Sequence, residues 1–215
     1  MSINNEIQEL KEQVLKMCMV VVSNINSSID FYLGKVEEVH INDDLVDQYE
    51  RLIEEMCINI LLKERLFAHD LKEVTGILKL VSDLERIGDH AEDIYDFTKR
   101  IKKDDRGKIK EIEGLAEFVI NMINRSIKSY INRDYEMANA VINDDDYVDE
   151  KYEEILKKLA NPQESLNFSD DNYLPFAIYT TLAVKYLERI ADHSVNIAEW
   201  AIYITSGYYK DKMIF

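Results

Sequence analysis

Glu85-Arg86-Ile87-Gly88-Asp89-His90 is the stretch that decides the fold, because the chain uses it twice. It returns as Glu188-Arg189-Ile190-Ala191-Asp192-His193, shifted by 103 positions (188 − 85). Between 84–94 and 187–197, seven of eleven positions are identical. Agreement this dense at one shift indicates an internal duplication, so each half is expected to repeat one helical unit.

The composition is typical of a soluble helical protein. Of 215 residues, 47% are hydrophobic and 32% are charged, while only six are Gly and two are Pro. Cys18 and Cys57 both lie in apolar helical runs, so we interpret them as small core residues in a reducing, cytoplasmic environment. The N-terminus lacks the basic and apolar regions of a secretion signal, and no run approaches the roughly 18 apolar residues of a membrane span.

The net charge of −16 argues against nucleic acid as a partner, because phosphate backbones bind clustered Lys and Arg. It suits cations, or a basic surface on another protein. Solubility alone also explains a high total charge. It does not explain why particular acidic residues recur in both halves.

Apolar residues at helical spacing predict six long helices. Ile7, Leu10, Val14, Met17 and Val21 mark one face of a first helix over about 5–38. Further helices are expected at about 43–66, 69–101, 109–139, from 145 to 158 and at 172–207, with a loop at 161–165 and no strand. We therefore predict an all-α fold of two tandem, pseudo-symmetric, antiparallel three-helix bundles, one in residues 1–104 and one in residues 105–215.

The repeated motif carries an acidic stripe. At about 100° per residue, Glu85, Asp89, Glu92 and Asp96 fall on one side of the 69–101 helix, away from its apolar residues. The stripe is predicted to face outward. Glu188, Asp192 and Glu199 share the corresponding side of the 172–207 helix. Like charges four residues apart repel, and a bound cation would relieve that repulsion.

A second acidic pair opens another helix in each half. Asp43 and Asp47 begin one, and Asp145 and Asp149 begin the other. In a single copy these would be ordinary first-turn acids favoured by the helix dipole. Their recurrence favours two metal sites made of oxygen ligands, which suit iron, manganese, magnesium or a similar hard cation. The predicted ligands are Asp43, Asp47, Glu85 and Asp89 in the first half, and Asp145, Asp149, Glu188 and Asp192 in the second.

The neighbouring cationic and histidine residues are assigned other roles. Arg86 and Arg189 are expected to pair with acids on an adjacent helix. His90 and His193 lie at the border of the buried face, so we expect them to hydrogen-bond between helices rather than to bind metal.

The paired motif, the duplication and the six-helix pattern resemble the PhoU family of accessory regulators of bacterial phosphate transport. The resemblance implies two three-helix bundles whose surface acidic pairs can carry multinuclear metal clusters. It also implies a cytoplasmic homodimer that couples the phosphate ABC transporter, through its ATPase, to a phosphate-sensing histidine kinase and represses the phosphate-starvation response. The first motif continues Ala91-Glu92-Asp93-Ile94, which departs from the family's usual ending and leaves room for the halves to differ in metal loading or partner choice.

Two other functions are alternatives to this reading of the sequence. A di-iron enzyme needs Glu-x-x-His on two helices, but here each His follows its Glu by five residues. No phosphate-binding Gly loop, nucleophile elbow or zinc signature accompanies the motifs, so we predict that the protein is not an enzyme. The other alternative is a metal-free helical adaptor whose acidic faces dock basic partner surfaces, or a protein that restrains phosphate uptake without signalling.

Overall fold

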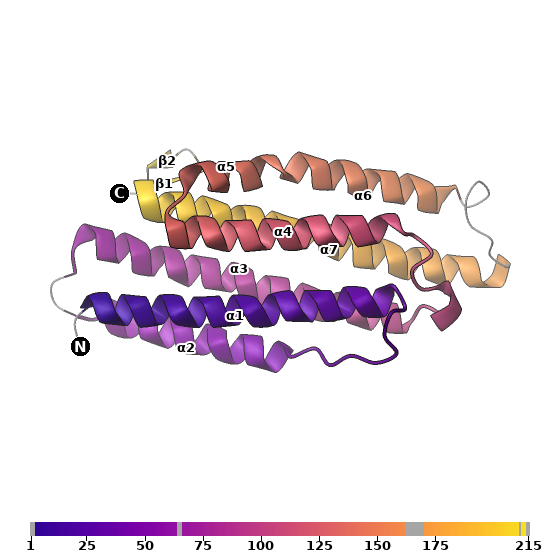
Figure 1. Cartoon of the computed structure of the whole chain (residues 1–215), viewed down its shortest axis with the longest axis horizontal. Coiled ribbons are helices and arrows are strands. Elements are labelled where there is room, and N and C mark those ends of the chain that lie inside the picture. The colour runs from indigo at the N-terminus through magenta and orange to yellow at the C-terminus, as the bar shows by residue number, and fades with distance from the viewer. Residues whose placement is uncertain (1–2, 64–65, 162–169, 211, 214–215) are drawn as a thin grey trace.

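The computed structural model describes residues 3–63, 66–161, 170–210 and 212–213 (Figure 1). Its helices are α1 (Ile3–Tyr32), α2 (Asp43–Leu61), α3 (Ala68–Lys99), α4 (Glu111–Asn132), α5 (Tyr135–Asn143), α6 (Asp145–Ala160) and α7 (Asp170–Ser206). A 3₁₀ turn spans Lys103–Asp105. After α7, strands β1 (Tyr208–Tyr209) and β2 (Lys212–Met213) pair antiparallel, with Tyr208 opposite Met213.

The predicted fold is confirmed. One bundle contains α1, α2 and α3, and the other contains α4, α7 and the α5–α6 pair, which run nearly in line (Figure 1). The longest packing surface lies between α3 and α7, which carry the two motif copies. The duplication therefore places its repeated stretches in the middle of the molecule. The prediction of no strand is wrong, because of the short β1–β2 hairpin.

The helical periodicity identified the core. The five apolar residues that predicted the first helix are all buried, and so are Leu84, Ile87, Leu187 and Ile190 around the motifs. Cys18 and Cys57 are buried free cysteines, as predicted. A single hydrophobic cluster joins the two bundles through these helices.

The first helix ends earlier than predicted. α1 stops at Tyr32, and Gly34 takes a left-handed conformation with φ of 68°. Glycine adopts this conformation without steric cost and commonly terminates helices. Residues 33–42 then form an irregular connection to α2.

The predicted helix over 109–139 is broken in two. Arg133 adopts a left-handed conformation with φ of 53°, and the Asp134 side chain accepts a hydrogen bond of 2.9 Å from the Met137 backbone N–H to cap α5. The periodicity hid this break because Ala138 and Val141 beyond it are also buried. Of the loop expected at 161–165, only Asn161 lies within the described residues.

Among the described helices, α1 is long and apolar enough to pass a composition test for a membrane span. Half of its most apolar window is buried inside the protein, where it packs against α2, α3 and α4. The core helix of a soluble protein passes the same test, so this helix is weak support for a span.

Two helical glycines should respond oppositely to alanine. A Cβ on Gly76 would lie 2.3 Å from Ile204 Cγ1 on α7, whereas a Cβ on Gly114 would meet nothing within 4 Å. We expect Gly114→Ala to raise the free energy of unfolding by roughly 0.5–1 kcal/mol. Gly76→Ala should lower it, because overpacking costs about 1–3 kcal/mol and outweighs the same helical gain. Urea unfolding of both variants checks the difference; equal stabilisation would contradict the tight α3–α7 contact.

Candidate functional site

The structure brings the predicted ligands of the first half together along α2 and α3. We call Asp43, Asp47, Glu85 and Asp89 the first carboxylate group. The Glu85 and Asp89 side chains are only 17% and 33% exposed, so this part of the acidic stripe is half-buried beside α2, whereas Glu92 and Asp96 face outward as predicted. Asp43 Oδ1 is buried without a hydrogen-bond partner.

Burial and the closeness of these carboxylates raise the pKa values of two of them. Burial raises the pKa of Glu85 to about 7, and the negative charges of Asp89, Glu50 and Asp47 add to the effect. Burial also raises the pKa of Asp43 to about 6, together with the charges of Glu92, Asp89 and Asp47. Each group is therefore disfavoured in its ionised form by lost hydration and by its neighbours.

The close approach of α2 to α3 depends on Gly88 within the motif. A Cβ on Gly88 would lie 3.0 Å from Val46 Cγ1 and 3.5 Å from Asp43 Oδ1. In the second half the matching residue is Ala191, which is fully buried and already carries a methyl group. At this position, α3 therefore carries no side chain where it packs against α2, whereas α7 carries a buried methyl group.

The second carboxylate group, Asp145, Asp149, Glu188 and Asp192, forms in the same way on α6 and α7. Burial raises the pKa of Asp145 to about 6, with contributions from the charges of Asp192, Asp149 and Glu188. Burial and the charge of Glu188 also raise the pKa of Asp192. All four predicted residues of this half are therefore near enough to influence one another.

Basic side chains pair with candidate ligands of both groups. Arg86 Nη1 donates to Asp89 Oδ2 at 3.0 Å and Arg86 Nε lies 3.4 Å from Glu85 Oε2, while Lys185 pairs with Glu188. The expectation that Arg86 pairs with an adjacent helix is wrong, since both partners lie on its own helix. In the described part of the chain, no three His, Cys, Asp or Glu side chains are close enough as they stand to hold one ion.

Sequence reasoning missed one member of the acidic surface and misplaced another. Glu50 on α2 faces the first carboxylate group, and its pKa is raised by burial and then by Glu54 and Asp47. Its spacing of three from Asp47 could have revealed it. Glu199 shares the predicted stripe on α7, but it lies 3.3 Å from Lys210, away from the second carboxylate group.

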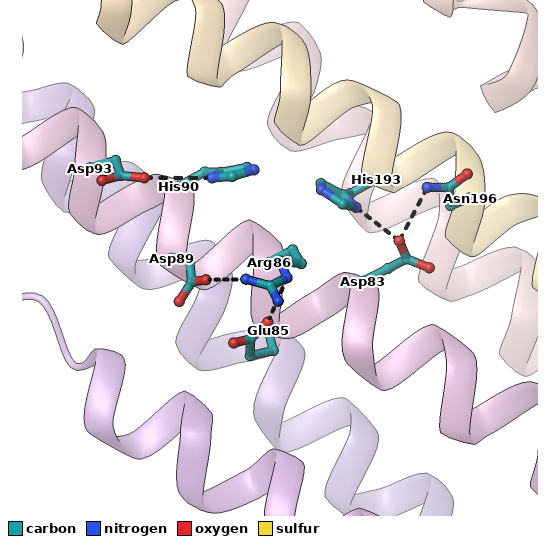
Figure 2. Close-up of polar contacts among 8 residues, drawn as sticks. All are labelled: Asp83, Glu85, Arg86, Asp89, His90, Asp93, His193 and Asn196. Atoms are coloured by element: carbon teal, nitrogen blue, oxygen red, sulfur yellow. Dashed lines mark hydrogen bonds and ion pairs between the residues drawn. The ribbon is translucent and has the colours of Figure 1, made fainter.

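The two motif histidines meet between the bundles. Figure 2 shows His90 and His193 approaching from α3 and α7, and their ring centroids are 5.5 Å apart. His193 Nδ1 lies 2.8 Å from Asp83 Oδ1 on α3, which confirms the predicted contact between helices for His193. The same expectation is wrong for His90, whose Nδ1 is buried without a hydrogen-bond partner and lies 3.7 Å from Asp93 on its own helix. His90 packs against Tyr186, and its pKa is lowered to about 4 by burial and by the nearby His193, Arg189 and Arg86.

Comparison with known proteins gives matches along both halves. The PhoU domain family matches residues 6–98 and 112–201. The chain is 36% identical to a phosphate-specific transport system accessory protein PhoU homolog of Aquifex aeolicus and 32% identical to one of Clostridium acetobutylicum. These alignments cover 96% of this chain in both cases, and 94% and 95% of the relatives. The crystal structure of PhoU from Pseudomonas aeruginosa superposes with a TM-score of 0.86 at 26% identity, covering 96% of this chain and all of that one.

Proposed function

Because this chain belongs to the PhoU family, we propose that it is an accessory regulator of phosphate-specific transport. The observation that carries the proposal is the family match to both halves, each of which contains one copy of the Glu-Arg-Ile-x-Asp-His motif near its end. The accessory role named for the similar proteins supports it, since they align with this chain from end to end.

In this proposal the protein acts by binding partners rather than by catalysis. It is a cytoplasmic homodimer that contacts the ATPase of a phosphate ABC transporter and a phosphate-sensing histidine kinase. By coupling the two, it represses the phosphate-starvation response when phosphate is plentiful. The acidic faces beside α3 and α7 are the proposed docking surfaces, since charged surfaces steer and select partners.

We further propose that the two carboxylate groups bind hard cations such as iron, manganese or magnesium. Oxygen-only donors, the unpartnered Asp43 Oδ1 and the raised pKa values of Asp43, Glu85 and Asp145 all fit a cation that would neutralise crowded charge. The residues that would hold it are the eight members of the two groups. When bound, it would supply positive charge and bridging coordination at the protein surface.

A metal-free adaptor is the second candidate. It is favoured by the ion pairs of Arg86 and Lys185, which already offset part of the acidic charge, and by the lack of three converging ligand side chains among the described residues. In that case the carboxylate groups would meet Lys and Arg side chains of a partner directly.

Deleting the gene is expected to switch on phosphate-starvation genes in phosphate-rich medium, because the repressing link would be lost. Transcript levels of those genes should rise toward their level in starved cells, and a wild-type copy should restore repression. Unchanged transcripts would refute the signalling role. If phosphate uptake rose in that strain without a transcript change, the protein would instead restrain uptake alone.

A further inference from the structure

A cavity of about 660 Å³ opens between α3 and α7, beside the paired histidines. Its walls include Arg86 and His90 of the first motif and Arg189 and His193 of the second, so the duplication supplies its polar groups in pairs. Asn196 and Lys210 complete its donor set. None of these six residues belongs to either carboxylate group.

The cations that line this cavity differ in whether they pair directly with a carboxylate. Arg86 pairs with Asp89, and Lys210 Nζ lies 3.3 Å from Glu199. Among the described residues, Arg189 contacts no carboxylate: its guanidinium lies 5.6 Å from the centre of the Tyr186 ring. Its charge does act on Asp93 of the adjacent helix α3, without a direct ion pair among the described residues.

The remaining donors are held in place by a shared acceptor. Asp83 Oδ1 lies 2.8 Å from His193 Nδ1 and accepts a hydrogen bond of 3.1 Å from Asn196 Nδ2 (Figure 2). His193 therefore presents its other ring nitrogen toward His90, and Asn196 retains a second amide hydrogen. Fixed donors of this kind lose little conformational freedom when a ligand binds.

Two carboxylates, Asp145 and Asp192, also line the cavity and oppose an anion there. Three cations also line it, namely Arg86, Arg189 and Lys210, of which Arg86 and Lys210 pair with Asp89 and Glu199. Arginine matches the geometry of phosphate because its planar group can donate two parallel hydrogen bonds. The donor geometry of Arg189 and its neighbours therefore favours a small tetrahedral oxyanion over a cation.

We propose that the cavity between α3 and α7 binds a tetrahedral oxyanion through Arg189, with Arg86, Asn196 and Lys210 as further donors, and that inorganic phosphate is its simplest ligand. This goes beyond the proposed function, because it makes the chain itself a phosphate-binding protein. It stands on the geometry of the cavity and does not require the regulatory role.

Isothermal titration with inorganic phosphate, against a sodium chloride titration of equal ionic strength, tests the proposal. Arg189→Gln should weaken phosphate binding about tenfold, because a charge-assisted hydrogen bond is lost. Arg100→Gln is the matched control: Arg100 is also exposed and lies 5.6 Å from the Tyr179 ring, but it does not line the cavity. Its phosphate affinity should equal that of the wild-type protein.

Circular dichroism first establishes that both variants are folded. Absence of saturable phosphate binding to the folded wild-type chain would overturn the proposal, and so would equal affinities of the two variants. Neither outcome bears on the regulatory function, which is read from transcripts in cells. Phosphate binding by the purified chain, without any transcript change on gene deletion, would uphold this inference and refute only the regulatory proposal.

Discussion

Replacing Asp89 and Asp192 with alanine is expected to abolish metal binding while leaving the helices intact. Each substitution removes one proposed ligand from one carboxylate group. Even outer partners of metal ligands are worth about 10–100-fold in affinity, so losing a direct ligand should cost more than about 100-fold. Both side chains lie at the edge of the core rather than inside it, so the fold should tolerate the change. Elemental analysis after dialysis against manganese or iron, with circular dichroism, measures both effects.

The matched control is the pair Glu12→Ala and Glu117→Ala, which removes the same charge from exposed positions on α1 and α4. This variant should keep the metal content of the wild-type protein. Equal metal loss in both double variants would mean that net charge alone attracts the ions. A wild-type protein that retains no stoichiometric metal would favour the metal-free adaptor, and a loss of helicity in the Asp89/Asp192 variant would show that these residues support the fold.

Glu73→Ala is expected to destabilise the protein by about 2–4 kcal/mol, since removing one partner of a buried ion pair costs about 3–5 kcal/mol and these partners are partly exposed. Glu73 on α3 is 3% exposed, and it joins Lys11 of α1 at 2.9 Å to Arg133, the residue that ends α4, at 2.6 Å. The substitution would leave two cations without their shared anion. It would also remove the ion pairs that connect α3 to α1 and to the end of α4.

Urea unfolding of Glu73→Ala beside Glu153→Ala measures this effect. Glu153 also pairs with a lysine in a helix, but both members are well exposed, so its loss should change stability by no more than about 0.5 kcal/mol. Similar losses for the two variants would show that the Lys11–Glu73–Arg133 cluster is an ordinary surface contact.

The sequence predicted most of the fold because the duplication and the helical period are long-range signals. It could not predict where two helices end. Single left-handed residues, Gly34 and Arg133, follow the ends of α1 and α4, and local backbone conformations of this kind leave no trace in the apolar pattern. The apolar pattern also does not tell which leucines are buried, since Leu45 and Leu52 of α2 are 37% and 43% exposed.

The eight candidate ligands were predicted from their spacing and recurrence, and the structure places these residues in two groups of four. Spacing could not tell how deeply they lie. Glu85 is half-buried because Gly88 lets α2 approach, a fact of packing between helices rather than along one. The partner of His193 was equally hidden, because Asp83 lies 110 positions earlier and only the packing of α3 on α7 joins them.

The difference between Gly88 and Ala191 has an evolutionary consequence. A symmetric dimer of single bundles must change both of its sites with every mutation, because one gene encodes both copies. Here both copies lie in one chain, and each is encoded by its own part of the gene. A methyl group could therefore be gained or lost beside one carboxylate group while the other stayed as it was. Fusion of the repeats thus allows each carboxylate group to change independently of the other within a shared core.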